Sequence, residues 1–330
     1  MKIFVPLHSN KKIKELIDVG ASEFYAGLIL DKWNENFRDF PINARGNNGK
    51  AANFSSYKEF AKAIRIASDY NKEVFLTLNS HCYTAKQIKF LYGIIKNFKN
   101  IGGNGIITSD LNLMPYIKEL NLKIVVGSDA AIYNYMSAQF FVDNYNVNRI
   151  ILPRDLNVNE IQSIKNKLNI EIEVFGQNGF CKFSNGICFA FHCKKMNSFC
   201  SSLDMSGWEY AKLNGRISFD QLYKIKENHF LYSQIYNNRA CSLCAIYKFI
   251  SLNIDSYKIV GREHEFGRIK KDVMLVANNI NIAKKSENEQ DYIIHMDNPY
   301  MTDPYKACKF GYQCCYNDYV RVINKNLLTM

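Results

Sequence analysis

Residues 55–79, SSYKEFAKAIRIASDYNKEVFLTLN, hold the pattern that decides the fold. Phe60, Ile64 and Ala67 recur at helical spacing on one face, and one of two serines before them is a candidate N-cap. The run EVFLTL follows at once and is nearly all apolar, which is typical of a strand buried on both faces. Asn79 places a polar side chain just past the run. The stretch predicts an amphipathic helix that leads into a buried parallel strand.

The same alternation recurs along the chain. In AKQIKFLYGIIKNF, residues 85–98, apolar residues again fall at helical spacing. Short β-branched or aromatic runs appear eight times, separated by helix-like or loop segments: KIFV near 2, EFYAGL near 23, EVFLTL near 73, GIIT near 105, KIVV near 123, RIIL near 149, EIEVF near 171 and YKIV near 257. Parallel strands that alternate with helices, eight in number, are typical of a closed barrel. We therefore predict an α/β fold, a (β/α)8 TIM-type barrel.

The interval between the seventh and eighth runs is far longer than one crossover helix requires. Because this interval holds most of the cysteines, we predict a cysteine-rich, cluster-binding insert over residues 176–250. The barrel with its insert is predicted to span residues 1–268. Residues 269–330 are predicted to form a C-terminal extension with a cysteine-containing tail.

The bulk composition limits the classes of protein to consider. Lys and Arg number 42 against 31 Asp and Glu, a net charge of +11 that favours polyanions such as RNA but also fits a solvated basic surface. The start MKIFVPLHSNKK does not have the pattern of a secretory signal, and no apolar run approaches the roughly 18 residues of a membrane span. We expect a cytoplasmic protein without membrane insertion, in a compartment where clustered thiols are more often metal ligands than disulfides.

The cysteine pattern of the insert points to a metal or iron–sulfur site. The insert contains Cys181, Cys188, Cys193, Cys200, Cys241 and Cys244. Six residues separate Cys181 from Cys188, which matches neither the pairs of zinc ribbons nor the close spacing of ferredoxins. A turn at Asn185 and Gly186 would bring these two cysteines together. Spacing alone leaves zinc and iron open, since thiolates suit both.

Other cysteines and histidines give weaker signals. A second cluster or metal could involve the tail residues Cys308, Cys314 and Cys315, with a fourth ligand borrowed from Cys193, Cys241 or Cys244. Cys82, beside His81, is a lone loop thiol, and such thiols are more often bystanders. No G-x-S-x-G, H-E-x-x-H or P-loop motif is present, so serine hydrolases, zincins and NTPases find no local support.

Polar residues stand just past the carboxyl ends of the runs, on the face where barrels of this kind carry out catalysis. They are His8, Asn79, Asp110, Ser128, Asp129, Arg154, Gln177 and Arg262, with Asn43 and Arg45 in the loop after the second run.

Several segments, in order along residues 1–268, resemble the peptidase U32 family, once described as collagenase-like proteases. GASEFYAGL is similar to the family's early Gly-Ala-Asp-x-Val-Tyr-x-Gly-Leu, and NARGNNGKAANFS to its Asn-Ala-Arg loop. IEVFGQNGFCKFSNGICF resembles the most distinctive block, a Glu-Val-Phe strand followed by two cysteines with six residues between them. LNIDSYKIVGRE resembles the last-strand Asp-Ser-x-Lys-Ile-Glu-Gly-Arg.

The resemblance implies a barrel with an oxygen-sensitive [4Fe–4S] cluster and oxygen-independent hydroxylation of RNA or ubiquinone precursors, for some members with prephenate as the oxygen donor. The cluster ligands carried over are Cys181, Cys188, Cys200 and one of Cys241 or Cys244. Two departures indicate a divergent subgroup with its own substrate. Val260 replaces a usual Glu, and Gly127, Ser128 and Asp129 replace a Thr-Gln or Val-Gln.

We expect an iron–sulfur-dependent enzyme of this family that hydroxylates or otherwise modifies RNA, a peptide or a small molecule. Asp110 and Glu173 are the acid or base candidates, and Arg154 and Arg262, with Arg45, would bind a carboxylated donor such as prephenate. The expected substrate-binding residues are Arg45, Asn79, Ser128, Asp129 and Gln177. The alternatives are a metal-dependent peptidase and a non-catalytic iron–sulfur scaffold subunit. A hetero- or homodimer is implied by relatives that act as heterodimers.

Overall fold

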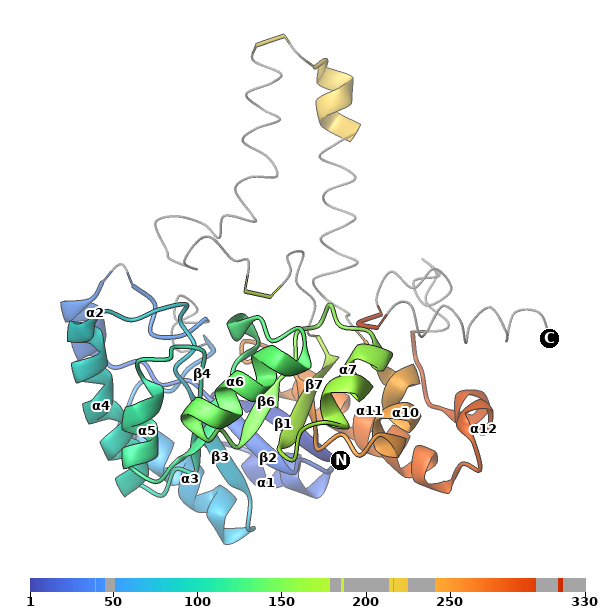
Figure 1. Cartoon of the computed structure of the whole chain (residues 1–330), viewed down its shortest axis with the longest axis horizontal. Helices are drawn as coiled ribbons and strands as arrows, with labels where there is room; N and C mark the ends of the chain where they lie inside the picture. The colour runs from blue at the N-terminus through green and yellow to red at the C-terminus, as the bar shows by residue number, and fades with distance from the viewer. Residues whose placement is uncertain are drawn as a thin grey trace.

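A computed structural model describes most of the chain, and Figure 1 shows a barrel of strands ringed by helices. The described residues are 1–38, 40–44, 51–178, 185–186, 214–215, 217–224, 241–300 and 314–316. All eight strands are parallel and pair in the order β1 to β8, with β8 closing on β1. The predicted TIM-type barrel is confirmed.

Every predicted apolar run forms a strand. The strands are β1 Lys2–Leu7, β2 Glu23–Ala26, β3 Glu73–Thr77, β4 Gly105–Thr108, β5 Lys123–Val126, β6 Arg149–Ile151, β7 Glu171–Gln177 and β8 Ser256–Ile259. The helices up to β7 are α1 Ile13–Asp18, α2 Asp31–Asn36, α3 Tyr57–Asp69, α4 Ala85–Asn100, α5 Met114–Glu119, the 3-10 turn η2 Ser128–Ala130, α6 Tyr135–Tyr145 and α7 Val158–Lys165. The later helices are η3 Leu243–Ala245, α10 Ile246–Ser251, α11 Phe266–Lys285 and α12 Glu289–His295.

The helix signals in the sequence correspond to real caps and buried faces. Ser56 is the N-cap of α3, and its Oγ accepts a hydrogen bond from the Glu59 amide at 3.2 Å. Phe60, Ile64 and Ala67 of this helix are buried against the strands, as their spacing predicts. Capping boxes also begin α4, α6 and α7, which satisfies amides that a helix start leaves without partners.

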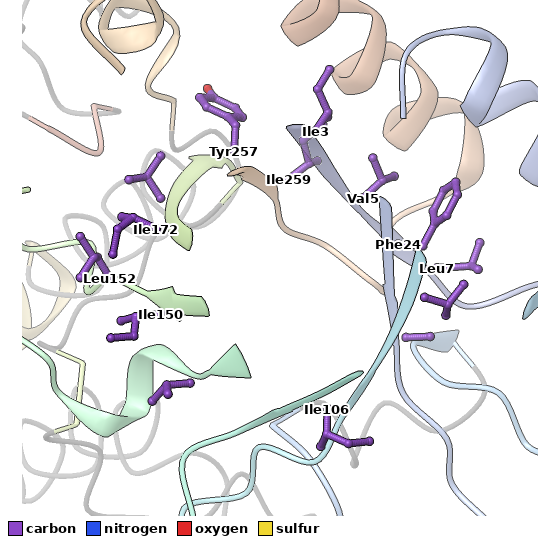
Figure 2. Packing of buried hydrophobic residues seen from close by; sticks show 14 of the residues in the cluster. Ile3, Val5, Leu7, Phe24, Ile106, Ile150, Leu152, Ile172, Tyr257 and Ile259 are labelled. Atoms are coloured by element: carbon purple, nitrogen blue, oxygen red, sulfur yellow. The ribbon is translucent and has the colours of Figure 1, made fainter. Parts of the chain in front are cut away.

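Each strand is buried on both faces, so the barrel has an inner and an outer core. Ile3 and Val5 point to the outer cluster under the helices, whereas Phe4 between them belongs to the inner cluster. Figure 2 shows side chains of the outer cluster, including Ile106, Ile150 and Tyr257. The inner cluster takes one side chain from each of seven strands: Phe4, Tyr25, Phe75, Ile107, Val125, Ile151 and Phe175.

The chain after β8 completes the helical layer. α11 packs against β1 and β8, and α10 and α12 pack against α11 (Figure 1). The boundary predicted at residue 268 falls in the first turn of α11. No helix among the described residues is both long and apolar enough to cross a membrane.

Candidate active site at the carboxyl ends of the strands

The turn predicted inside the cysteine-rich insert is present, and it is docked on the barrel. Asn185 is 6% exposed, and its Nδ2 donates to Ser128 Oγ at 3.1 Å. Its Oδ1 accepts from the Arg154 amide at 3.3 Å, and its own amide donates to Asp155 Oδ2 at 3.2 Å. Its carbonyl accepts from the Tyr133 hydroxyl at 2.9 Å. One side chain thus ties the insert to the loops after β5 and β6.

The backbone conformation and close packing of this turn require a glycine at position 186. Its φ of +82° is one that side-chain-bearing residues rarely adopt. A Cβ on Gly186 would also lie 2.3 Å from the Cβ of Ala131. Cys181 and Cys188 flank this turn in the sequence but lie outside the described residues, as do Cys200 and Arg45.

Arg154 is a stacked cation at the mouth of the barrel. Its guanidinium carbon lies 4.2 Å from the centroid of the Phe175 ring, which belongs to the inner cluster. Its Nε is buried and has no hydrogen-bond partner. None of the ion pairs among the described residues involves Arg154. A buried N–H donor on a guanidinium is suited to binding an anion.

Arg262 is engaged in a buried polar cluster that joins the loop after β8 to the connection between α2 and α3 and to the end of β3. Its Nη1 donates to Asn53 Oδ1 at 3.1 Å and to Thr77 Oγ1 at 2.9 Å, and its Nη2 donates to Asn43 Oδ1 at 2.9 Å. Asn43 Nδ2 in turn donates to Asn53 Oδ1 at 3.1 Å. Gly27 permits the arrangement, because a Cβ there would lie 2.0 Å from Asn53 Oδ1 and 2.2 Å from Arg262 Nη1.

Asp110 organises the loops after β3 and β4. Its Oδ2 accepts from the Tyr83 amide at 2.8 Å, and its Oδ1 accepts from the amides of Asn112 at 2.8 Å and Leu113 at 3.2 Å. An acid or base role for this carboxylate would compete with these three bonds. Asn79 makes a similar loop contact, since its Oδ1 accepts from the Ala44 amide at 3.2 Å.

Glu173 lies inside the barrel, below Phe175, and not in the loops of the carboxyl face. Its Oε1 accepts from Lys258 Nζ at 2.7 Å, and its Oε2 accepts from Arg149 Nη1 at 3.0 Å. Glu173 is fully buried, so both partners are needed to offset its desolvation. The two acid or base candidates therefore belong to separate hydrogen-bond networks: Asp110 to the loops after β3 and β4, and Glu173 to the barrel interior.

The charges around Glu173 form a network at the amino-terminal half of the barrel. Arg149 also binds Glu23 with both terminal nitrogens and Glu171 through Nε at 2.7 Å. Burial alone would lower the pKa of Arg149, but the bond to Glu23 and the three carboxylate charges raise it. Burial lowers the pKa of Lys258, and the charge of Glu173 opposes this. The network fills the barrel with paired charge.

Cys241 is held at the end of β7 by two N–H donors. Gln177 Nε2 lies 3.8 Å from its sulfur, and the Leu243 amide lies 3.5 Å from it. The other amide atom of Gln177, Oε1, is buried without a partner. Cys244 is also buried and lies near Tyr292, whose pKa is raised by burial and then by the charges of Cys244 and Cys241.

Residues 314–316, which we call the C-terminal strap, lie beside Cys241 at the end of β7. Cys314 is the parallel bridge partner of Cys241, and the Cys315 amide donates to the Cys241 carbonyl at 2.8 Å. The Tyr316 hydroxyl donates to the Phe175 carbonyl at 3.1 Å. A second site in the tail could borrow a fourth ligand from Cys193, Cys241 or Cys244, and the strap places Cys314 beside Cys241. Cys308 lies outside the described residues.

Most of the predicted cluster ligands lie outside the described part of the chain. Within it, no three His, Cys, Asp or Glu side chains gather in a way that could hold a metal ion. Three of the expected cluster ligands are outside it. The sulfur of Cys241 nevertheless fits a thiolate ligand, because N–H donors to sulfur stabilise the anionic form and tune cluster chemistry.

Some residues of the site were not singled out from the sequence. Arg154 contacts Phe175, and Arg262 contacts Asn53 and Thr77. In the sequence these three partners resemble ordinary strand or loop residues. Ser128 and Asn185 meet across 57 positions, which no local pattern reveals. His8 was in the polar set, and its Nδ1 is buried without a partner.

The comparisons with known proteins agree on a family. The sequence profile of peptidase family U32 matches residues 8–319. An uncharacterized protease of Methanocaldococcus jannaschii is 28% identical over 57% of this chain and 43% of that protein. A tRNA hydroxylation protein of Bacillus subtilis is 24% identical over 57% of this chain and 41% of its own length. A 23S rRNA 5-hydroxycytidine synthase of Escherichia coli is 23% identical over 66% of this chain and 32% of its own length.

Among solved structures, a U32 peptidase superposes with a TM-score of 0.39 and 14% identity, over 54% of this chain and 69% of that chain. The chain spans less than half the length of the curated relatives it matches.

Proposed function

Because the chain belongs to peptidase family U32, we propose that it is an iron–sulfur-dependent enzyme that hydroxylates RNA without molecular oxygen. Two relatives are named for RNA hydroxylation, one acting on tRNA and one on 23S rRNA. The net charge of +11 favours a polyanionic substrate.

The observation that carries the proposal is the environment of Cys241. Its sulfur receives the N–H groups of Gln177 and Leu243 at the carboxyl end of β7, where the cysteine-rich insert leaves the barrel. A buried thiol without such donors would favour the neutral form, which is a poor metal ligand. The donor pair therefore suits Cys241 to be the thiolate that completes a ligand set.

The proposed ligands are Cys181, Cys188, Cys200 and one of Cys241 or Cys244. The docked turn at Asn185 supports this set, because it anchors the sequence between Cys181 and Cys188 to the loops after β5 and β6. When bound, a [4Fe–4S] cluster supplies one-electron chemistry at this face of the barrel. A second cluster involving Cys308, Cys314 and Cys315 remains a separate prediction.

Arg154 is the proposed anchor for a carboxylated oxygen donor such as prephenate. Its guanidinium is stacked on Phe175, and its buried Nε has no hydrogen-bond partner, so a carboxylate could accept the Nε–H. Arg262 already donates to Asn43, Asn53 and Thr77, and we assign it to positioning the loops.

The proposal is tested by purifying the protein without oxygen and measuring its visible spectrum, iron and sulfide. We expect about four irons and four sulfides per chain for a [4Fe–4S] cluster, and loss of both in Cys181→Ala. Cys82→Ala is the matched control, since Cys82 is exposed and lies outside the proposed ligand set. A colourless wild-type protein that holds stoichiometric zinc would rule the iron–sulfur assignment out.

A further inference from the structure

We propose that the outer face of α4, together with Tyr116 of the neighbouring helix α5, is a docking surface for RNA. The choice of RNA as the occupant rests on the proposed function, and the inference adds where on the protein the RNA lies. α4 is on the outside of the barrel, and α5 packs beside it (Figure 1). The surface offers cations for phosphates and an exposed ring for a base, which is the chemistry that RNA requires.

All the charged side chains of α4 are positive. The helix, Ala85–Asn100, contains no Asp or Glu, and its four lysines are exposed on the side that faces away from the barrel: Lys86, Lys89, Lys96 and Lys99. None of the ion pairs among the described residues involves these lysines. RNA phosphates could therefore supply the negative charge for this face.

The pattern on α4 differs from that of a helix face that serves only for solubility. Such a face usually mixes both signs, because opposite charges three or four residues apart stabilise a helix and like charges weaken it. The neighbouring helix α3 follows this rule, with Glu59 three residues before Lys62 and Arg65 four residues before Asp69, all exposed. The lysines of α4 instead form two like-charged pairs, each three residues apart. A bound polyanion would relieve their repulsion.

Two tyrosine rings border the lysines. The rings of Tyr92 in α4 and Tyr116 in α5 meet edge to face, with their centroids 5.5 Å apart. The Tyr92 hydroxyl donates to Glu119 Oε1 at 2.8 Å, which fixes the ring against which Tyr116 packs. Tyr116 is 40% exposed, so a base could stack on its open side. Lys99 Nζ donates to the Asn121 carbonyl at 3.5 Å, which brings the basic face next to the chain that follows α5.

The surface begins at the rim of the candidate active site. Thr84 is the N-cap of α4, and the amide of Tyr83 before it donates to Asp110 at the carboxyl face. A helix of 16 residues is about 24 Å long, so the lysines extend from this rim down the outside of the barrel. RNA bound along α4 would therefore have its adjoining nucleotides at the carboxyl ends of the strands, where barrels of this kind carry out catalysis.

The first test measures binding of a fluorescently labelled, unmodified tRNA transcript to the full chain by anisotropy at several salt concentrations. In the triple variant Lys86→Gln, Lys89→Gln, Lys96→Gln, affinity at about 0.1 M salt should fall roughly tenfold to a hundredfold. The slope of log affinity against log salt should become shallower by about 2–3, since each phosphate contact contributes about 0.7–0.9.

The matched control removes the same amount of charge from another helix. Lys271, Lys284 and Lys285 are exposed on α11, on the other side of the barrel (Figure 1). Replacing all three with Gln should change the affinity by less than about threefold, because a charge far from the RNA is screened by salt. Equal losses in the two triple variants would overturn the proposal, since net charge alone would then explain the binding.

The stacking contact has a separate signature. Tyr116→Leu should weaken binding about fivefold or more and leave the salt slope unchanged, because stacking a base releases no counterion. Tyr223→Leu is the control, since Tyr223 is 61% exposed and lies outside the surface. An affinity for the transcript equal to that of wild type in Tyr116→Leu would overturn the proposed surface.

A footprint on the wild-type protein tests the surface without any substitution. Lysine acetylation with and without the transcript, read by mass spectrometry, should show protection of Lys89 and Lys96 but not of Lys285. The proposal is overturned by a footprint that spares α4, or by a wild-type protein that binds anionic lipid vesicles but not the transcript.

These readouts need neither a cluster nor catalysis, so their failure is distinct from failure of the proposed function. A colourless protein that binds the transcript through α4 would refute the iron–sulfur assignment and leave the docking surface in place. An active hydroxylase whose RNA affinity ignores the lysines of α4 would refute the docking surface alone.

Discussion

At the scale of the residue, Glu173 holds two buried cations inside the barrel. We expect Glu173→Gln to lower the free energy of unfolding by about 3–5 kcal/mol, because it leaves Lys258 and Arg149 buried with less opposing charge. Glu73→Gln is the matched control, since Glu73 pairs with Lys123 near the surface and such pairs contribute at most about 1 kcal/mol. Denaturant unfolding measures both. Equal losses in the two variants would contradict the buried network.

Gly27 is expected to be intolerant of any side chain. Gly27→Ala should destabilise the protein by about 1–3 kcal/mol, since the new Cβ would collide with Asn53 and Arg262. Gly93→Ala should instead be neutral or stabilising by up to about 1 kcal/mol, because Gly93 lies in α4 with nothing near its Cβ position. Thermal unfolding of the pair is the measurement, and a shift of the same sign in both would be inconsistent with this contact.

His8 should make stability depend on pH. Burial lowers its pKa, against the opposing effects of the Arg262 backbone and Glu263. The folded protein therefore binds fewer protons than the unfolded chain below the unfolded pKa of about 6.5, and stability falls as the pH drops through that value. Wild type should lose stability relative to His8→Gln between about pH 7 and pH 5. Urea titrations across this range test it, and a difference that stays constant would refute it.

At the scale of the element, the turn at Asn185 and Gly186 links the insert to the barrel. Gly186→Ala should undock it, because the Cβ would meet Ala131, and iron content should fall if the proposed ligands flank this turn. Gly215→Ala is the matched control, since Gly215 also has a positive φ, +67°, but nothing within 4 Å of its Cβ position. Iron per chain, measured after anaerobic purification, should fall only in Gly186→Ala. Equal iron content in both variants would show that the turn does not contribute to cluster binding.

The elements themselves were predictable because their signals are local. Eight apolar runs became eight strands, and the Ser56 cap and buried face of α3 follow directly from their spacing. The partners inside the site were not predictable in this way. Glu173 was an acid or base candidate from the sequence, but its side chain follows the two-residue period of β7 into the barrel. There it meets Lys258, which comes from a strand 85 positions away. The sequence named Cys241 only as one of three thiols that the tail could borrow, because no local pattern selects it as the neighbour of Cys314.

At the scale of the whole molecule, the two ends of the barrel differ in the residues they gather. The amino-terminal half is filled by Arg149 and its carboxylates, which close the interior with paired charge. The carboxyl ends gather Arg154, Cys241, the docked turn and the C-terminal strap. This division matches the placement of active sites in barrels of this kind.

The proposed RNA hydroxylation is tested most directly by nucleoside mass spectrometry of total RNA. The comparison uses a strain that lacks the gene, complemented with wild type, Cys188→Ala or Cys82→Ala. We expect one nucleoside to lose a single oxygen in the deletion strain, and the hydroxylated form to return with wild type and Cys82→Ala but not with Cys188→Ala. An identical set of modified nucleosides in all four strains would contradict the account.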